Sequence, residues 1–214
     1  LVSTSLIASD KLNTKSYYFF FKHSVYITLA IAILITFSFM NQKILAKFSL
    51  ILFLMAFLSL LLVPFLGIEV KGSKRWLDLI FLPRFQPVEI VKPFFIVTLS
   101  FMLTMQNRRL YFKYFLSTLF TLPILMLLVY QPDIGQTLLI SMVWLALIFI
   151  SGINIFIFFI FFLFIGSTVS YLVLFVTKFE YIKIRLFAFL DSSSGNNYQA
   201  EKASDAIING GFFG

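Results

Sequence analysis

The 214-residue chain contains no cysteine, a single histidine and few charged residues, which make up 12% of the sequence. The lack of cysteine excludes disulfides, thiolate nucleophiles and cysteine-ligated metal sites. One histidine, His23, cannot form a histidine-rich metal site, and we interpret it as a polar residue at a membrane interface. The sequence also contains no P-loop, no Rossmann glycine pattern and no zinc-ligand spacing. Because these motifs are absent, the sequence cannot be assigned to an enzyme class through them.

Apolar residues dominate what remains: 60% of the chain is hydrophobic, and the mean hydropathy is +0.98, unlike a soluble domain. A membrane-spanning helix needs roughly 20 apolar residues. Four uncharged runs approach or exceed that length: 24–42, 48–68, 114–132 and 134–177. The last run holds two helices if Ser151-Gly152-Ile153-Asn154 forms a turn, and a further span begins near Pro87. We therefore predict an all-α polytopic membrane bundle with six complete spans.

The two ends of the chain differ from this pattern. Residues 1–9 are uncharged but too few to cross a bilayer, so they predict the end of a partial first helix. Residues 178–214 are more polar, and they predict the beginning of a large aqueous loop that stops at Gly214. We therefore predict a transmembrane bundle over 1–177 followed by the start of a loop over 178–214, and we interpret the sequence as a fragment of a longer protein.

The distribution of charge leaves the membrane orientation open. If residues 1–9 are the first helix, connections after odd-numbered helices carry eleven Lys and Arg residues, and connections after even-numbered helices carry five. The positive-inside rule would place the odd connections in the cytoplasm, although eight of the nine acidic residues also lie there. If the odd connections face outward instead, an anionic ligand would explain their cations.

The connection between Gly67 and Gln86 concentrates cations around an aromatic residue. Lys71, Lys74, Arg75 and Arg84 lie around Trp76, with Asp78 among them. Arginine can bind a phosphate through two hydrogen bonds, lysine offers a point charge, and tryptophan favours the depth of lipid head groups. The pattern fits a phosphate or pyrophosphate head group, and a generic basic patch beside the membrane fits it equally well.

The next span begins with the polar sequence QPVEIVKP. Pro87 suits the first helical position, and a carboxylate at Glu89 is favoured near the positive end of the helix dipole. Glu89 and Lys92 are three residues apart, so they can pair on one face. They form either a structural ion pair or part of a polar cavity. Pro93 predicts a kinked helix or a late helix start.

A short polar connection, QPDIGQ, joins the two spans on either side of Pro132. Proline and glycine favour a tight turn, and Asp133 suits the N-cap of the following helix. By the odd and even count, Asp133 lies at the same membrane face as the basic connection. It therefore either caps a helix only or also contributes to a shared polar site.

Four segments in this order, VKGSKRWLDL, FQPVEIVKP, QPDIGQT and RLFAFLDSSSGNNYQAEKASDAIINGGFFG, resemble the SEDS (shape, elongation, division and sporulation) family of bacterial peptidoglycan polymerases. The chain is most similar to the cell-division branch of that family. The resemblance implies a membrane enzyme of about ten helices that polymerises lipid II at the outer face of the bacterial cytoplasmic membrane, at the division septum. It therefore implies that the odd connections face outward and that residues 178–214 begin an extracytoplasmic loop.

The resemblance also implies roles for particular residues. The expected substrate-binding residues are Lys74, Arg75, Trp76, Gln86, Glu89, Lys92, Gln131 and Asp133. The expected catalytic aspartate lies beyond Gly214, so the fragment is expected to be inactive. No metal site and no cofactor are expected, although a divalent cation is left open. The expected partners are lipid II, the membrane, a class B penicillin-binding transpeptidase and other divisome proteins, with no nucleic acid.

The predicted reaction is glycosyl transfer, in which a sugar hydroxyl of lipid II attacks an anomeric carbon with a pyrophosphate leaving group. Lys74 and Arg75 would neutralise the departing pyrophosphate, and Glu89 and Lys92 would hold the cavity. The sequence leaves two alternatives to a polymerase open. A flippase for lipid II would also need polar residues at the edge of a span, and a divisome scaffold would need only contact surfaces.

Overall fold

The computed structural model describes residues 17–70, 73–79, 82–105 and 109–184, together with 204, 205, 207 and 208. The predicted partial first helix, Lys71 and most of the predicted loop over 178–214 lie outside these residues. The chain divides into two compact units, of which one contains residues 1–45 and 188–214 and the other contains residues 46–187. The first unit contributes one long described helix, α2 (Tyr18–Ser38), which has no buried residue. The second unit contains the core and all the contacts discussed below.

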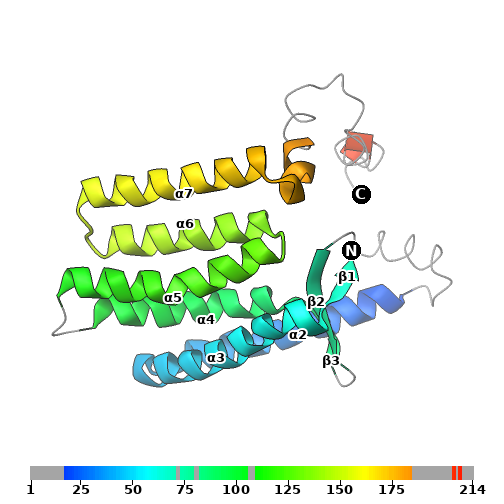
Figure 1. The fold of residues 1–214 in the computed structure, drawn as a ribbon. Coiled ribbons are helices and arrows are strands. Elements are labelled where there is room, and N and C mark those ends of the chain that lie inside the picture. The colour runs from blue at the N-terminus through cyan, green and yellow to red at the C-terminus, as the bar shows by residue number, and fades with distance from the viewer. Residues whose placement is uncertain are drawn as a thin grey trace. The chain divides into compact units, whose positions relative to one another are not determined.

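Helices make up most of the second unit, as Figure 1 shows. Their bounds are α3 (Gln42–Leu66), α4 (Pro87–Thr104), α5 (Leu110–Tyr130), α6 (Ile134–Ile150), α7 (Ile155–Phe175) and the short 3-10 helix η1 (Thr177–Phe179). Helix α4 contacts both α5 and α6, α5 contacts α6, and α6 contacts α7. The predicted all-α membrane bundle is therefore confirmed.

Five of the described helices are long and apolar enough to cross a membrane: α2, α3, α4, α5 and α7. Helix α6 is equally apolar but has only 17 residues, the lower limit for a spanning helix. The turn predicted at Ser151 to Asn154 separates α6 from α7. Gly152 adopts a φ of 89°, which glycine tolerates well, and the Asn154 side chain accepts a 2.9 Å hydrogen bond from the Phe156 N–H.

A small antiparallel sheet occupies the connection that the sequence marks as basic. Its strands are β1 (Ile68–Val70), β2 (Ser73–Leu79) and β3 (Leu82–Phe85), in the order β1-β2-β3. Glu69 lies opposite Lys74 and Ile68 lies opposite Trp76 in the β1–β2 register. Strand β2 also contacts α4, so the sheet gives the basic residues fixed positions at one end of the helices.

Helix α4 differs from the sequence expectation in one respect. It begins at Pro87 and continues through Pro93 to Thr104, so the predicted late start is wrong. Pro87 occupies the first turn, where its missing N–H is not needed. The buried residues Val88, Val91 and Phe95 recur at helical spacing, and packing of that face against α5 and α6 offsets the hydrogen bond that Pro93 cannot donate.

Aromatic rings connect three helices in the core. Phe53 of α3 lies 4.5 Å from Phe120 of α5 between ring centroids, and Phe120 lies 5.9 Å from Phe95 of α4 with nearly parallel planes. Such pairs add to the packing energy beyond their buried area. Deeper in the bundle, the Trp144 indole N–H donates a 3.3 Å hydrogen bond to the Ser117 hydroxyl, which satisfies a polar group that lipid and core cannot solvate.

We expect Gly67→Ala to lower the free energy of unfolding by roughly 1 to 3 kcal/mol, the range of strained backbone substitutions. Gly67 follows α3 directly, and a Cβ there would lie 2.3 Å from the Val63 carbonyl oxygen. The backbone must therefore move. Gly166→Ala in α7 is the matched control, because a Cβ there meets nothing within 4 Å and alanine favours the helix. Thermal unfolding midpoints in detergent that are equal for the two variants would contradict the prediction.

Candidate functional site

Segments far apart in the sequence meet at the sheet end of the helices. The end of α3, the start of α4, the α5–α6 turn, strand β2 and the residues after α7 all contribute side chains there. Their contacts fall into three groups: a buried cluster around Asp133, an ion pair on α4, and a cavity that exposes two lysines.

Asp133 is the centre of the buried cluster, with a side chain only 8% exposed. It is the N-cap of α6, where its carboxylate accepts the Gln136 N–H at 3.4 Å. The same carboxylate accepts a 3.2 Å hydrogen bond from the Gln86 side-chain amide and lies 3.6 Å from an Arg75 guanidinium nitrogen. Asp133 therefore both caps a helix and joins the polar cluster, so the two predicted roles coexist.

Arg75 is committed to the protein by several bonds. One of its terminal nitrogens donates to the Pro132 carbonyl oxygen and lies 3.4 Å from the Tyr181 hydroxyl. The Tyr181 hydroxyl donates to the same Pro132 carbonyl at 2.8 Å. Strand β2, the α5–α6 turn and the residues after α7 are thus joined at a single carbonyl group. A guanidinium held in this way orients the sheet before any ligand binds.

Gln131 is another buried polar residue at this end. It is 5% exposed, and its side-chain amide donates a 3.4 Å hydrogen bond to the Leu60 carbonyl of α3. Leu60 lies one turn before Pro64 of the same helix, and a proline at that position leaves the Leu60 carbonyl without its usual helical donor. Gln131 therefore supplies a donor that α3 itself lacks.

The ion pair predicted on α4 is confirmed, because the Lys92 ammonium lies 2.6 Å from the Glu89 carboxylate. The other Glu89 oxygen accepts a 3.0 Å hydrogen bond from the Gln136 side chain of α6. Glu89 is 51% exposed and Lys92 is 22% exposed, so the pair is accessible as well as structural. Gln136 connects it to the Asp133 cap through the peptide of α6.

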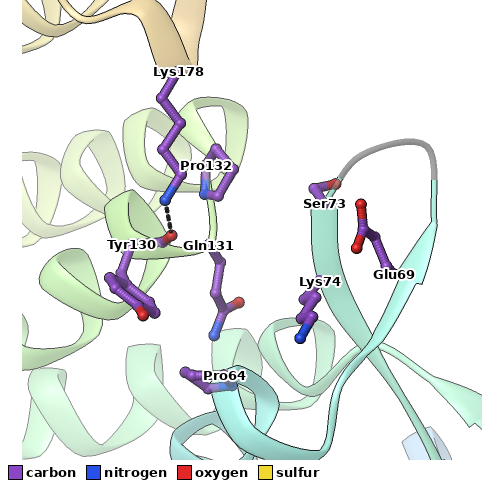
Figure 2. Close-up of a pocket in the computed structure, with 8 residues that line it drawn as sticks. All are labelled: Pro64, Glu69, Ser73, Lys74, Tyr130, Gln131, Pro132 and Lys178. Atoms are coloured by element: carbon purple, nitrogen blue, oxygen red, sulfur yellow. Dashed lines mark hydrogen bonds between the residues drawn. The ribbon is translucent and has the colours of Figure 1, made fainter.

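A cavity of about 300 Å³ lies beside this cluster. It is lined by Pro64, Glu69, Ser73, Lys74, Tyr130, Gln131, Pro132 and Lys178 (Figure 2). Lys178 donates a 2.8 Å hydrogen bond to the Tyr130 carbonyl and lies 5.0 Å from the centre of the Tyr130 ring. Lys74 is exposed, and within the described part of the chain its side chain has no ion pair or hydrogen bond. The cavity thus presents two ammonium groups from different segments.

Two larger apolar cavities lie along α7. One, of about 620 Å³, has Arg75, Asp133 and Tyr181 at its polar edge and apolar residues of α6 and α7 along the rest. The other, of about 460 Å³, is lined mainly by apolar residues of α5, α6 and α7, with Thr137, Ser141 and Thr168 among them. Helix α7 has no buried residue, so its side facing α5 and α6 is loosely filled. Polar groups and an apolar cleft are therefore adjacent.

The structure separates seven of the eight predicted substrate-binding residues into two sets. Arg75, Gln86, Gln131 and Asp133 bond mainly to the protein, whereas Lys74, Glu89 and Lys92 keep accessible polar atoms. Trp76 is half-buried in β2. Arg84 is not part of either set, because it forms an exposed 3.1 Å ion pair with Asp78 on the hairpin.

Two contributors, Lys178 and Tyr181, were not among the predicted site residues. Their sequence signal was weak: both follow the last uncharged run and lie three positions apart. Within the described residues, no group of three or more His, Asp or Glu side chains is placed to hold a metal ion.

These features define a class: a multi-pass helical membrane protein with a buried polar cluster, an accessible ion pair and a cationic cavity at one end of its bundle. The chain belongs to the FtsW/RodA/SpoVE family of cell cycle proteins, whose family pattern it matches over residues 1–214. The predicted SEDS membership is therefore confirmed.

Several curated relatives share this family. The chain is 32% identical to the probable peptidoglycan glycosyltransferase FtsW of Coxiella burnetii and 29% identical to that of Idiomarina loihiensis, over all of its own length in each case. It covers 59% and 53% of those two proteins. The chain thus spans between half and three fifths of the length of these relatives.

Two solved structures share its fold. Thermus thermophilus RodA superposes with a TM-score of 0.59 at 22% identity, over 78% of this chain and 55% of that protein. A chain of a peptidoglycan synthase complex, studied for the coordination of polymerization and crosslinking, superposes with a TM-score of 0.66 at 24% identity, over 87% and 56%.

Proposed function

We propose that the complete protein is a peptidoglycan glycosyltransferase that polymerises lipid II into glycan strands for septal wall synthesis during cell division. The observation that carries the proposal is the cationic cavity beside the apolar clefts along α7. A lipid-linked pyrophosphate needs cations for its head group and an apolar surface for its chain. The naming of the FtsW relatives as probable peptidoglycan glycosyltransferases supports the same reaction.

In this proposal the sheet end of the bundle faces outward, where the growing glycan strand would be. The excess of Lys and Arg that the sequence places on that side would then reflect an anionic head group and not the positive-inside rule. The protein would act in the bacterial cytoplasmic membrane at the division septum, with a class B penicillin-binding transpeptidase as partner. The likeness to a chain of a peptidoglycan synthase complex supports such a partner.

The chemical roles follow from charge and accessibility. A glycosyl transfer from a lipid pyrophosphate places negative charge on the leaving group, and preorganised cations stabilise that charge in the transition state. Lys92 and Glu89 would orient the reacting sugar or the loop that follows α7, because they are accessible and mutually fixed. The catalytic base would come from a part of the complete protein that follows Gly214.

The test is polymerisation of purified lipid II by the complete protein in detergent, read as glycan strand length on gels. We expect Glu89→Gln to lower the rate at least about tenfold, because loss of the negative charge releases Lys92 from its ion pair and leaves one amide oxygen where two carboxylate oxygens served Lys92 and Gln136. Asp78→Asn removes the same charge from an exposed pair on the hairpin, so it should retain nearly the full rate.

Two results would contradict the proposal. The first is equal polymerisation by the Glu89 and Asp78 variants, which would remove the α4 ion pair from the mechanism. The second is transfer of lipid II across vesicle membranes by the complete protein without any polymer, which would identify a flippase.

A further inference from the structure

The cationic side chains at the sheet end differ in how many bonds they already form to the protein. Arg75 already bonds to the Pro132 carbonyl, the Tyr181 hydroxyl and Asp133. Lys74, its neighbour on β2, has no such bond within the described residues and is exposed. A new anion would have to compete with protein acceptors at Arg75 but not at Lys74.

Lys178 joins Lys74 at the same cavity, although the two come from η1 and β2. Its ammonium group has three donors, and the Tyr130 carbonyl accepts one of them at 2.8 Å. The Tyr130 ring, 5.0 Å away, stabilises the charge without using another donor. Lys178 is thus held in place while donors remain for a ligand. Figure 2 shows both lysines at the cavity that Gln131 and Pro132 border.

The size and charge of the cavity limit what it can bind. Its volume of about 300 Å³ is at the lower end for small-molecule sites, so it suits a head group and not a whole lipid-linked sugar. Lys74 and Lys178 outweigh the one carboxylate of its lining, Glu69, which leaves a net charge of +1. A compact anion with several acceptor oxygens fits both limits.

We propose that this cavity is a subsite for the pyrophosphate ester of a lipid-linked substrate, with Lys74 and Lys178 as its cations. Arg75 is then a positioning residue, which holds β2 and therefore Lys74 against the α5–α6 turn. This inference rests on the proposed function and adds two things to it: it assigns Lys178 to the head-group site and removes Arg75 from direct contact with the phosphates.

The experiment measures equilibrium binding of farnesyl pyrophosphate to the complete protein in detergent, beside farnesyl monophosphate and inorganic pyrophosphate. We expect Lys74→Gln and Lys178→Gln each to raise the Kd for farnesyl pyrophosphate about tenfold, the usual effect of one charge-assisted hydrogen bond. Glu69→Gln should lower the Kd severalfold, because it removes the carboxylate that repels the anion. Lys47→Gln, at the other end of α3, should change nothing.

Further variants separate binding from folding. Lys178→Arg keeps the charge and should keep most of the affinity, so a large loss in that variant would overturn the subsite. An unchanged Kd in both glutamine variants, or an equal loss in Lys47→Gln, would also overturn it. Equal affinity for inorganic and farnesyl pyrophosphate would overturn the assignment to a lipid ester.

The outcome is independent of the test of the proposed function. If the complete protein polymerises lipid II but Lys74→Gln and Lys178→Gln leave the KM for lipid II unchanged, only the subsite is wrong. If the complete protein binds farnesyl pyrophosphate through these lysines but forms no polymer, the subsite stands as a lipid-pyrophosphate site and the polymerase proposal is wrong.

Discussion

Replacing Asp133 with alanine is expected to lower the free energy of unfolding by about 3 kcal/mol, the lower end for breaking a buried ion pair. The carboxylate is 8% exposed and serves Arg75, Gln86 and the first turn of α6 together. Its removal leaves a guanidinium near the core without its counter-charge and takes away an N-cap, which alone contributes about 1 kcal/mol. The measurement is the thermal unfolding midpoint of the complete protein in detergent, at one heating rate.

The hairpin offers a matched control for Asp133. Asp78 also pairs with an arginine, at 3.1 Å from Arg84, but both side chains are about half exposed. Asp78→Ala should therefore cost less than about 1 kcal/mol. Asp133→Asn keeps an oxygen for the cap, so its loss of unfolding free energy should lie between those of Asp133→Ala and Asp78→Ala. If Asp133→Ala unfolds at the same temperature as Asp78→Ala, the cluster is not a structural element.

Phe95→Ala is expected to cost about 3 kcal/mol of unfolding free energy, because it opens a cavity in the centre of the bundle. Phe95 is 1% exposed and stacks on Phe120, which in turn packs on Phe53. The loss is mainly one of packing and not of transfer from water, since lipid tails are as apolar as the core. That is why we expect the lower end of the range for soluble proteins.

Phe101→Ala on the same helix is the control for this substitution. Phe101 is 50% exposed on the outside of the bundle, where lipid can fill the space that the ring leaves. Its unfolding midpoint should stay close to that of the unsubstituted protein. A midpoint for Phe101→Ala as low as that for Phe95→Ala would mean that the aromatic stack does not hold α3, α4 and α5 together.

The division between structural and accessible polar residues changes how substitutions at this end should be interpreted. Loss of activity in an Arg75 or Asp133 variant would follow from displacement of the sheet alone, so it would not identify a ligand contact. Variants of Lys74, Lys178 and Glu89 alter groups with accessible atoms, and their effects report on a ligand more directly. The buried cluster fixes the position of the site, and the accessible groups give it its charge.

Local features of this protein were determined by the sequence itself. The apolar runs specify a membrane bundle because only helices satisfy every backbone group in lipid. The Glu89–Lys92 pair follows from helical spacing, and the turn at Gly152 and the cap at Asp133 follow from the conformations that glycine and aspartate favour. Each of these features can be predicted without knowing which helices are neighbours in the bundle.

The tertiary structure alone decided which polar groups meet and which remain accessible. Lys178 and Lys74 share a cavity because α7 returns to the end of the bundle that carries β2, and no local pattern encodes that approach. The same packing places the Pro132 carbonyl beside Arg75 and Tyr181, so it occupies one of the two cations that the sequence predicted as ligands of the pyrophosphate. Side-chain contacts of this kind depend on distances between segments, which helix periodicity and loop composition leave undetermined.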